Sequence, residues 1–227
     1  MSTSAIIVAA GCGSRIGGEL PKQYQNVCGK PLLFYALQKF EACPLIHDVV
    51  LSVAEAFLSY AANEIVDRFG FSKVKKIIAG GEKRQDSVYA GLNALEPGTK
   101  MVAIHDAARP FVSVEKIEEV IKAGQQHGAA ILAIPAKDTI KTSRGGFVGK
   151  TPERDALWLV QTPQVFEYDL IRRAYEEAYK YGIYQTDDSA LVERTGHPVK
   201  IVEGEPENLK ITVPFDLKLA EMLLRAR

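Results

Sequence analysis

Residues 5–24 read AIIVAAGCGSRIGGELPKQY, and this stretch decides the fold of the chain. Its apolar run over residues 5–10 is short enough for one buried strand. Four glycines follow within eight residues, namely Gly11, Gly13, Gly17 and Gly18. Glycine permits positive φ and close approach of the backbone, so successive N–H groups can form a concave anion site. Arg15 and Lys22 lie in and just after this loop, and with it they predict a cradle for a triphosphate.

Two better-known phosphate loops do not fit this stretch. The dinucleotide-binding fingerprint G-x-G-x-x-G needs glycine where Ile16 stands, and it expects an acidic residue about 20 positions further on. The first acidic side chain at the end of a second expected strand is Glu55, which is too late. The P-loop needs a lysine where Glu19 stands. A nicotinamide-dependent oxidoreductase is therefore disfavoured, and an ordinary glycine-rich turn is the structural alternative.

The composition limits the class of protein. The chain has 227 residues, of which 47% are hydrophobic, so a sizeable core is possible. Its 28 basic and 28 acidic side chains cancel, so neither nucleic acid nor an anionic membrane is expected as the main partner. The three cysteines are widely spaced without a metal-binding pattern, which indicates reduced thiols. We expect a cytoplasmic protein, because no stretch resembles a signal peptide or a membrane span.

Strands and helices alternate along the chain. Apolar runs predict strands over residues 5–10, 47–53, 73–79, 100–105 and 129–134, and helical spacing predicts helices from Lys30 and over residues 55–69 and 113–127. Further on we expect strands over residues 158–164, 199–203 and 209–212 and helices over residues 167–182, 190–195 and 214–227. This pattern is typical of the α/β class. We expect one Rossmann-like domain over residues 1–227, a mostly parallel twisted sheet flanked by helices.

Glycines and charged residues follow two of these expected strands. Ligands of such sheets bind at the carboxyl ends of the strands. Gly80-Gly81 follows one strand, and Asp106 ends the next, with Arg109 three residues later. Asp106 suits Mg²⁺, which takes few protein carboxylates and completes its shell with water and substrate phosphate. The alternative for Asp106 is a helix or turn cap, and His105 is interpreted as a structural residue.

The pattern changes over residues 136–160. Short segments of alternating polarity surround Gly145-Gly146, which indicates a β-hairpin arm rather than part of the core. An isolated hairpin is marginally stable in water. We therefore expect the arm to pack on a second subunit and to form a homodimer. The alternative is an exposed excursion with a surface arginine.

Motifs over nearly the whole chain carry a family resemblance. They are A-A-G-x-G-x-R with P-K-Q-Y, Gly80-Gly81, Arg84 with Ser87-Val88, the HDAARP stretch of residues 105–110, Thr162-Pro163-Gln164, Thr186-Asp187-Asp188 and Asn208-Leu209-Lys210. In this order they resemble the sugar-nucleotide pyrophosphorylase type of nucleotidyltransferase. Within that type the match is closest to the 2-C-methyl-D-erythritol 4-phosphate cytidylyltransferases of the non-mevalonate isoprenoid pathway. Glu82 stands where that family is expected to have aspartate.

The resemblance implies a role for each matching residue. The residues implied to bind the nucleotide are Ala9, Ala10, Gly11, Gly13, Gly81, Glu82 and Ser87. The residues implied to be catalytic are Arg15, Lys22 and Lys210. The second substrate would be bound by Asp106, Ala107, Arg109, Thr162 and Thr186, with Thr139 and Arg154 supplied by the arm of a partner subunit. Asp106 would also hold Mg²⁺.

The implied reaction transfers a cytidylyl group from CTP to 2-C-methyl-D-erythritol 4-phosphate and releases pyrophosphate. The attacking phosphate oxygen is already ionised at neutral pH, so catalysis rests on positioning and charge stabilisation. Two alternatives stay open: a ribitol 5-phosphate cytidylyltransferase, and a non-catalytic nucleotide-binding module on the same fold. Ala108 favours the erythritol acceptor, whereas Asp106 and Lys210 favour an enzyme over a binding module.

Overall fold

The computed structural model describes residues 2–11 and 20–226, and a seven-stranded sheet lies at its centre. The strand order is β11-β7-β10-β6-β1-β4-β5. The bounds are β1 Thr3–Ala9, β4 Asp48–Val53, β5 Val74–Ala79, β6 Met101–Asp106, β7 Ala129–Pro135, β10 Trp158–Glu167 and β11 Lys200–Glu203. Neighbouring strands pair in parallel except at β10, which runs antiparallel to both β6 and β7. The expected Rossmann-like, mostly parallel α/β sheet is confirmed.

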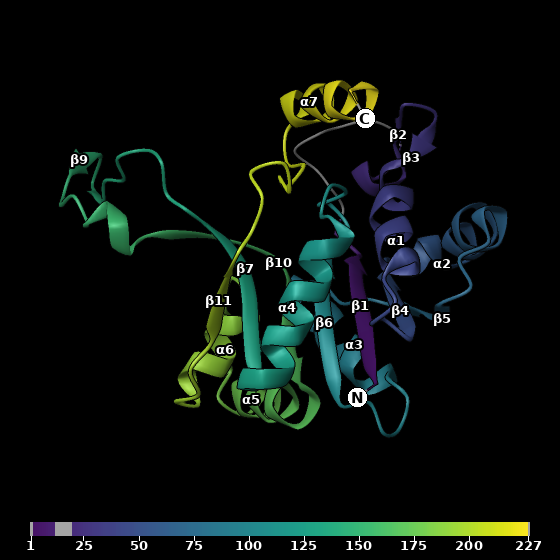
Figure 1. The fold of residues 1–227 in the computed structure, drawn as a ribbon, viewed down its shortest axis with the longest axis horizontal. Helices are drawn as coiled ribbons and strands as arrows, with labels where there is room; N and C mark the ends of the chain where they lie inside the picture. The colour runs from purple at the N-terminus through teal and green to yellow at the C-terminus, as the bar shows by residue number, and fades with distance from the viewer. Residues whose placement is uncertain (1, 12–19, 227) are drawn as a thin grey trace.

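Helices cover both faces of this sheet (Figure 1). One face carries α1 (Leu32–Ala42) and α4 (Val114–His127), and the other carries α3 (Arg84–Ala94), α5 (Tyr168–Lys180) and α6 (Ser189–Arg194). Side chains of β1 alternate between the two faces, so Ala5 and Ile7 pack in the apolar core beneath α1 and α4, and Ile6 packs in the core beneath α3, α5 and α6. Strands buried on both faces need continuous apolar runs, which is why these runs were visible in the sequence. Across the described residues, no helix is long and apolar enough to cross a membrane.

Small elements gather at the carboxyl edge of the sheet. They are the 3-10 helix η1 (Lys22–Tyr24) and the paired strands β2 (Asn26–Val27) and β3 (Lys30–Pro31). The last helix, α7 (Pro214–Arg225), lies above the carboxyl end of β1 in Figure 1. It joins a separate apolar cluster that includes Val27, Leu32 and Ile211. Between β4 and β5 the chain forms η2 (Glu55–Phe57), α2 (Leu58–Tyr60) and the π-helix η3 (Ala61–Asp67).

Four expected elements have different bounds or a different form in the structure. The segment expected as one helix over residues 55–69 is divided into η2, α2 and the π-helix η3. The helix expected from Lys30 begins at Leu32, because Lys30 and Pro31 pair with β2. The strand expected to end at residue 164 continues to Glu167. The strand expected over residues 209–212 is absent from the described elements. The Ile211 N–H instead donates to the carbonyl of Ala108 at 2.8 Å, and the Ile211 side chain packs in the cluster beneath α7.

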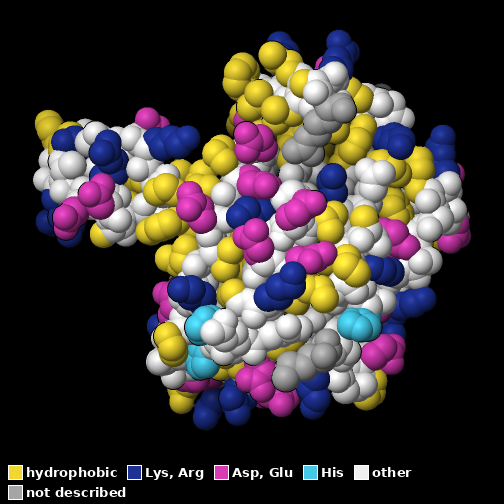
Figure 2. Space-filling view, in the orientation of Figure 1, with side chains coloured by type: hydrophobic (Ala, Val, Ile, Leu, Met, Phe, Trp, Pro, Cys, Tyr) yellow, Lys and Arg dark blue, Asp and Glu magenta, His cyan; other side chains and the backbone are white. Residues whose placement is uncertain are grey.

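The arm projects from the body of the molecule as a separate lobe (Figures 1 and 2). Its short strands β8 (Ser143–Arg144) and β9 (Phe147–Val148) form an antiparallel hairpin, followed by the 3-10 helix η4 (Arg154–Ala156). Gly145 and Gly146 connect the strands with φ values of 58° and 84°, which suits a two-residue hairpin turn. Residues 141–150 are all exposed, and Phe147 retains 81% of its surface. The expected hairpin arm is confirmed, with shorter strands than the polarity pattern predicted.

Candidate active site

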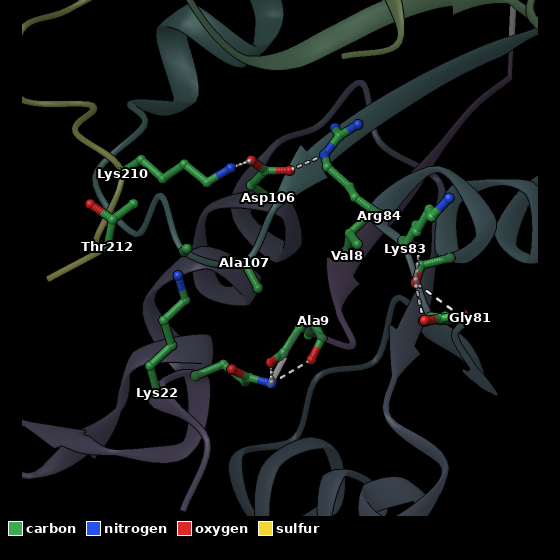
Figure 3. Close-up of a pocket in the computed structure, with 15 residues that line it drawn as sticks. Val8, Ala9, Lys22, Gly81, Lys83, Arg84, Asp106, Ala107, Lys210 and Thr212 are labelled. Atoms are coloured by element: carbon green, nitrogen blue, oxygen red, sulfur yellow. Dashed lines mark hydrogen bonds and ion pairs between the residues drawn. The ribbon is translucent and has the colours of Figure 1, made fainter. Parts of the chain in front are cut away.

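A pocket opens at the carboxyl ends of β1 and β6 (Figure 3). Its walls come from distant parts of the chain: Val8 and Ala9 at the end of β1, Gly11, residues 81–84 and Ser87 before and within α3, residues 106–108 at the end of β6, and Lys210 with Thr212 before α7. Lys22 closes one side. The pocket therefore gathers most of the residues expected to bind the nucleotide or act in catalysis, namely Ala9, Gly11, Lys22, Gly81, Glu82, Ser87 and Lys210. It also contains Asp106 and Ala107, which were expected to bind the second substrate.

The two ends of the phosphate loop are held together by Gln23. Its amide nitrogen donates to the carbonyls of Ala9 at 2.5 Å and Gly11 at 3.0 Å. Gly13 and Arg15 lie outside the described residues, so their expected roles stay predictions. Ala10 does not line the pocket but packs against Gly80, where an added Cβ would lie 2.5 Å from the Ala10 Cβ. Gln23 lies within the P-K-Q-Y motif, but no role was predicted for it.

The loop that follows β5 closes onto the first turn of α3. The Gly81 N–H donates to the Ser87 hydroxyl at 3.2 Å, and the Lys83 N–H donates to the Asp86 carboxylate at 3.0 Å. A Cβ at Gly81 would collide with Asp86, so the close approach requires glycine at this position. The cap at the start of α3 is thus supplied by Asp86, and Ser87 lines the pocket. Recognition of a base by Gly81, Glu82 and Ser87 stays a prediction.

Asp106 occupies the centre of the charged groups (Figure 3). One carboxylate oxygen accepts from Arg84 Nε at 2.7 Å, and the other lies 2.6 Å from Lys210 Nζ. Burial alone would raise the pKa of Asp106, but Arg84 and Lys210 together hold that pKa well below its usual range. The carboxylate is therefore ionised throughout the physiological pH range. Among the described residues no cluster of three acidic, histidine or cysteine side chains surrounds it.

A second pocket adjoins the first across Asp106. Arg84, Asp106 and Lys210 line both pockets. The second pocket also holds Arg109, Thr162 and Thr186, as expected for the acceptor residues. Its remaining walls come from β10 and from residues 187–193. The two pockets therefore share a boundary formed by the charged side chains of Arg84, Asp106 and Lys210.

Arg109 is fixed in this second pocket by backbone carbonyls. Its two terminal nitrogens donate to Asn208 O at 2.7 Å and Val160 O at 3.1 Å. Its Nε is buried and has no hydrogen-bond partner among the described residues. Burial lowers the pKa of Arg109, because it penalises the charged form. A guanidinium held in this way is suited to an anionic ligand.

Thr162 and His105 form an internal network beneath the pockets. The Thr162 hydroxyl accepts from the Asp106 N–H at 3.1 Å and lies 3.0 Å from His105 Nδ1. His105 Nε2 lies 2.9 Å from Arg109 O. Burial lowers the pKa of His105 to about 4, so the ring is neutral at physiological pH. These contacts agree with a structural His105. The expected contact of Thr162 with the second substrate stays a prediction.

Thr139 and Arg154 lie in the arm, away from both pockets of their own chain. Both side chains are exposed, and Arg154 is 3.5 Å from the Lys137 carbonyl. Within one chain they therefore do not join the site. Arg84 and Asp188 belong to the motifs quoted from the sequence, yet neither carried a predicted role. The structure places the guanidinium of Arg84 between Asp188 and Asp106.

The chain is similar to known proteins over almost its whole length. The family model for 2-C-methyl-D-erythritol 4-phosphate cytidylyltransferase matches residues 3–226. A protein of that description from Pelotomaculum thermopropionicum is 48% identical over 225 residues, covering 99% of this chain and 94% of the relative. The crystal structure of 4-diphosphocytidyl-2C-methyl-D-erythritol synthase from Anaerococcus prevotii superposes with a TM-score of 0.87 at 32% identity, covering 99% of this chain and 96% of that one. The 2-C-methyl-D-erythritol 4-phosphate cytidylyltransferase of Thermus thermophilus gives a TM-score of 0.80 at 34% identity, covering 97% and 98%.

Proposed function

The chain belongs to the 2-C-methyl-D-erythritol 4-phosphate cytidylyltransferase family, and from this premise we infer the reaction that it catalyses. It is a nucleotidyltransferase that transfers the cytidylyl group of CTP to 2-C-methyl-D-erythritol 4-phosphate. The products are 4-diphosphocytidyl-2-C-methyl-D-erythritol and pyrophosphate. The family match runs over almost the whole chain, and the fold and both pockets lie within the matched residues.

The shared wall between the two pockets is the observation from which we assign one substrate to each pocket. CTP occupies the pocket beside residues 81–87, and the acceptor phosphate occupies the pocket that contains Arg109 and Thr186. The reacting phosphorus then lies near Asp106 and Lys210, which line both pockets. Holding two reactants on either side of one boundary removes most of the entropic cost of their encounter.

Cations rather than an acid–base pair support the chemistry. An oxygen of the acceptor phosphate attacks the α-phosphorus of CTP in line, and pyrophosphate leaves. Lys210 and Lys22 stabilise the negative charge on the phosphate oxygens during this step. The Lys22 ammonium donates to the Ile211 carbonyl at 2.8 Å, which places it next to the segment that carries Lys210. His105 is buried, neutral and hydrogen-bonded on both nitrogens, so it is not the base.

The residues present also fit a Mg²⁺ ion. Mg²⁺ is held in such sites by one or two carboxylates, and its remaining ligands are water and substrate phosphate. Asp106 offers one ionised carboxylate in the pocket that we assign to CTP. When bound, Mg²⁺ would neutralise charge on the phosphates of the nucleotide. Arg84 and Lys210 keep the Asp106 carboxylate ionised, and the oxygen that faces Lys210 would be open to the ion when Lys210 turns to a substrate phosphate.

A homodimer completes the acceptor pocket in this proposal. Residues 141–150 of the arm are all exposed, and its strand β9 exposes Phe147 and Val148. In a twofold dimer the arm packs on the neighbouring subunit, and Thr139 and Arg154 contact the acceptor phosphate there. The exposure of both residues in a single chain supports this arrangement.

A pyrophosphate-release assay tests the proposed function. Purified protein is incubated with each of the four nucleoside triphosphates against 2-C-methyl-D-erythritol 4-phosphate and ribitol 5-phosphate. We expect CTP to outperform UTP by about 10²-fold or more, because a mismatched base leaves buried polar groups unpaired. Preference for ribitol 5-phosphate would move the assignment to the other acceptor. Nucleotide binding without pyrophosphate release from any pair would leave only a binding module.

A further inference from the structure

We propose that Arg84 is a positioning residue for this reaction, and that Asp188 and Tyr175 anchor it so that it holds the Asp106 carboxylate at the boundary of the two pockets. The inference rests on the proposed function, because the boundary is where that function places the reacting phosphorus. Arg84 is the first residue of α3, and Asp106 is the last residue of β6. Figure 3 shows the guanidinium and Lys210 approaching Asp106 from opposite sides.

Three hydrogen bonds fix the plane of the Arg84 guanidinium. The two terminal nitrogens donate to the two oxygens of Asp188 at 3.0 Å and 2.7 Å. Nε donates to Asp106 at 2.7 Å. A bidentate pair with a carboxylate sets the orientation of a guanidinium as well as its position. The direction of the Nε–H bond, and therefore the place of the Asp106 oxygen, follows from the contact with Asp188.

The anchor is itself held from a different helix. Asp188 is fully buried, and the Tyr175 hydroxyl of α5 donates to it at 2.5 Å. Residues 179–185 also hold the first turn of α3. Gln85 donates to Ile183 O at 3.0 Å and accepts from the Gln185 N–H at 3.0 Å, and the Tyr179 hydroxyl donates to Asp86 at 2.6 Å. The segment that contributes Thr186 to the acceptor pocket is thereby tied to the loop that borders the nucleotide pocket.

The two cations on Asp106 differ in what holds them. Lys210 is 39% exposed, and its long side chain comes from a segment outside the sheet. Arg84 is 24% exposed and already carries a bidentate partner. When Lys210 turns to a substrate phosphate, Arg84 keeps Asp106 paired and in place. A role confined to neutralising the buried Asp188 would need only the bidentate contact, so the Nε contact with Asp106 is the feature that such a role leaves unexplained.

Charge and position can be separated by a pair of substitutions. Arg84→Gln leaves Asp188 buried without its cation, so we expect a lower Tm together with lower activity. Arg84→Gln combined with Asp188→Asn removes the uncompensated charge, so Tm should recover. Turnover should stay about 10- to 100-fold below wild type in that double variant, the range seen when a group that orients a catalytic-site carboxylate is lost. Recovery of both Tm and kcat would reduce Arg84 to a counter-charge for Asp188.

Arg84→Lys provides a variant that retains the positive charge. Lysine keeps a cation beside Asp188 but lacks the planar guanidinium, so we expect Tm near wild type. We expect kcat to fall by about 10- to 100-fold, as in the double variant. Wild-type kcat in Arg84→Lys would overturn the proposal even if the double variant failed to fold. Arg68→Gln is the matched control, because it removes an exposed arginine that contacts Glu64 and the Phe69 ring and lines neither pocket, and it should change neither Tm nor kcat.

Calorimetric titration of each protein with CTP, with and without Mg²⁺, supplies a readout besides turnover. We expect Arg84→Lys to weaken the Mg²⁺-dependent part of CTP binding, because Asp106 is no longer held in place. CTP binding that is equal to wild type in both conditions, together with unchanged kcat, would contradict the inference. If wild-type protein releases no pyrophosphate, the proposed function fails, whereas normal wild-type turnover with unaffected Arg84 variants sinks only the positioning role.

Discussion

Lys210 allows a sharp test, because its effects on stability and on turnover are expected to differ in size. Its ammonium lies 2.6 Å from Asp106, and its side chain is 39% exposed. Lys210→Met removes the cation and keeps much of the apolar stem. Asp106 retains Arg84 as a partner, so no buried charge is left without compensation.

The two expected magnitudes follow from these surroundings. Solvent screens a partly exposed ion pair, so its loss should lower the free energy of unfolding by about 1 kcal/mol or less. Loss of a charge contact that strengthens in the transition state should lower kcat by about 10²- to 10³-fold. Lys210→Arg keeps the charge in a different geometry and should recover only part of that loss.

The assay combines pyrophosphate release at saturating substrates with thermal unfolding. Lys122→Met is the control, because Lys122 pairs with Glu118 on an exposed face of α4 and lines neither pocket. We expect both measurements to be unchanged in the control. Near-wild-type kcat in a folded Lys210→Met would refute the assigned role, and a loss of turnover that merely tracks the loss of folded protein would refute the separation of the two effects.

Three further predictions concern other parts of the chain. Lys22→Ala should reduce kcat by about 10²-fold or more in the same assay, and Lys22→Arg should retain only part of the wild-type kcat. Near-normal turnover in Lys22→Ala would refute the catalytic role of Lys22. Arg154→Ala should raise KM for the acceptor phosphate and leave KM for CTP nearly unchanged, and mixing it with Lys22→Ala should restore activity on subunit exchange; demonstrated heterodimers without recovery would contradict the arm exchange. Partial burial raises the pKa of Asp216, but hydrogen bonds from Thr212 and Val213 more than reverse this and lower it overall. As a helix cap, Asp216 therefore stabilises the fold by about 1 kcal/mol above the ordinary carboxyl pKa near 4, and this stabilisation is lost as pH falls through the lowered pKa. Asp216→Asn should lower Tm at neutral pH, and the difference in Tm from wild type should vanish in acid. A difference in Tm that persists at low pH would oppose this account.

The sequence revealed those parts of the fold whose cause is local. Strands covered on both faces must be apolar throughout, so β1 and β6 were evident as runs. Residues 209–212 also alternate in polarity, but only the N–H of Ile211 joins Ala108, and no ladder forms. A period-2 pattern reports that one side of a segment is buried, and here the covering element is α7 rather than a sheet.

The predictable part of the site was the part set by the sheet. Ligands of parallel sheets bind at the carboxyl ends of the strands, so the glycine loop after β5 and Asp106 at the end of β6 were expected at the same edge of the sheet. The contact between Arg84 and Asp188 joins residues that are 104 positions apart. No periodicity or spacing encodes such a pair, because it depends on how α5 and α6 pack on the sheet. For the same reason the sequence predicted that Thr162 lies at the site, but it did not predict the contacts of its hydroxyl with the Asp106 N–H and the His105 ring.

The return of residues 208–212 to Ala108 has a consequence for the timing of activity in a newly made chain. All the strands that precede this segment leave the ribosome before Lys210 does. A nascent chain can therefore form β1, β6 and the Arg84–Asp106 contact while one of its reactive cations is still being added. The same order applies to refolding from denaturant, because contacts between residues far apart in the chain form late. Catalytic activity should thus not precede the recovery of the sheet, and a chain stopped before residue 208 should be inactive because it lacks Lys210.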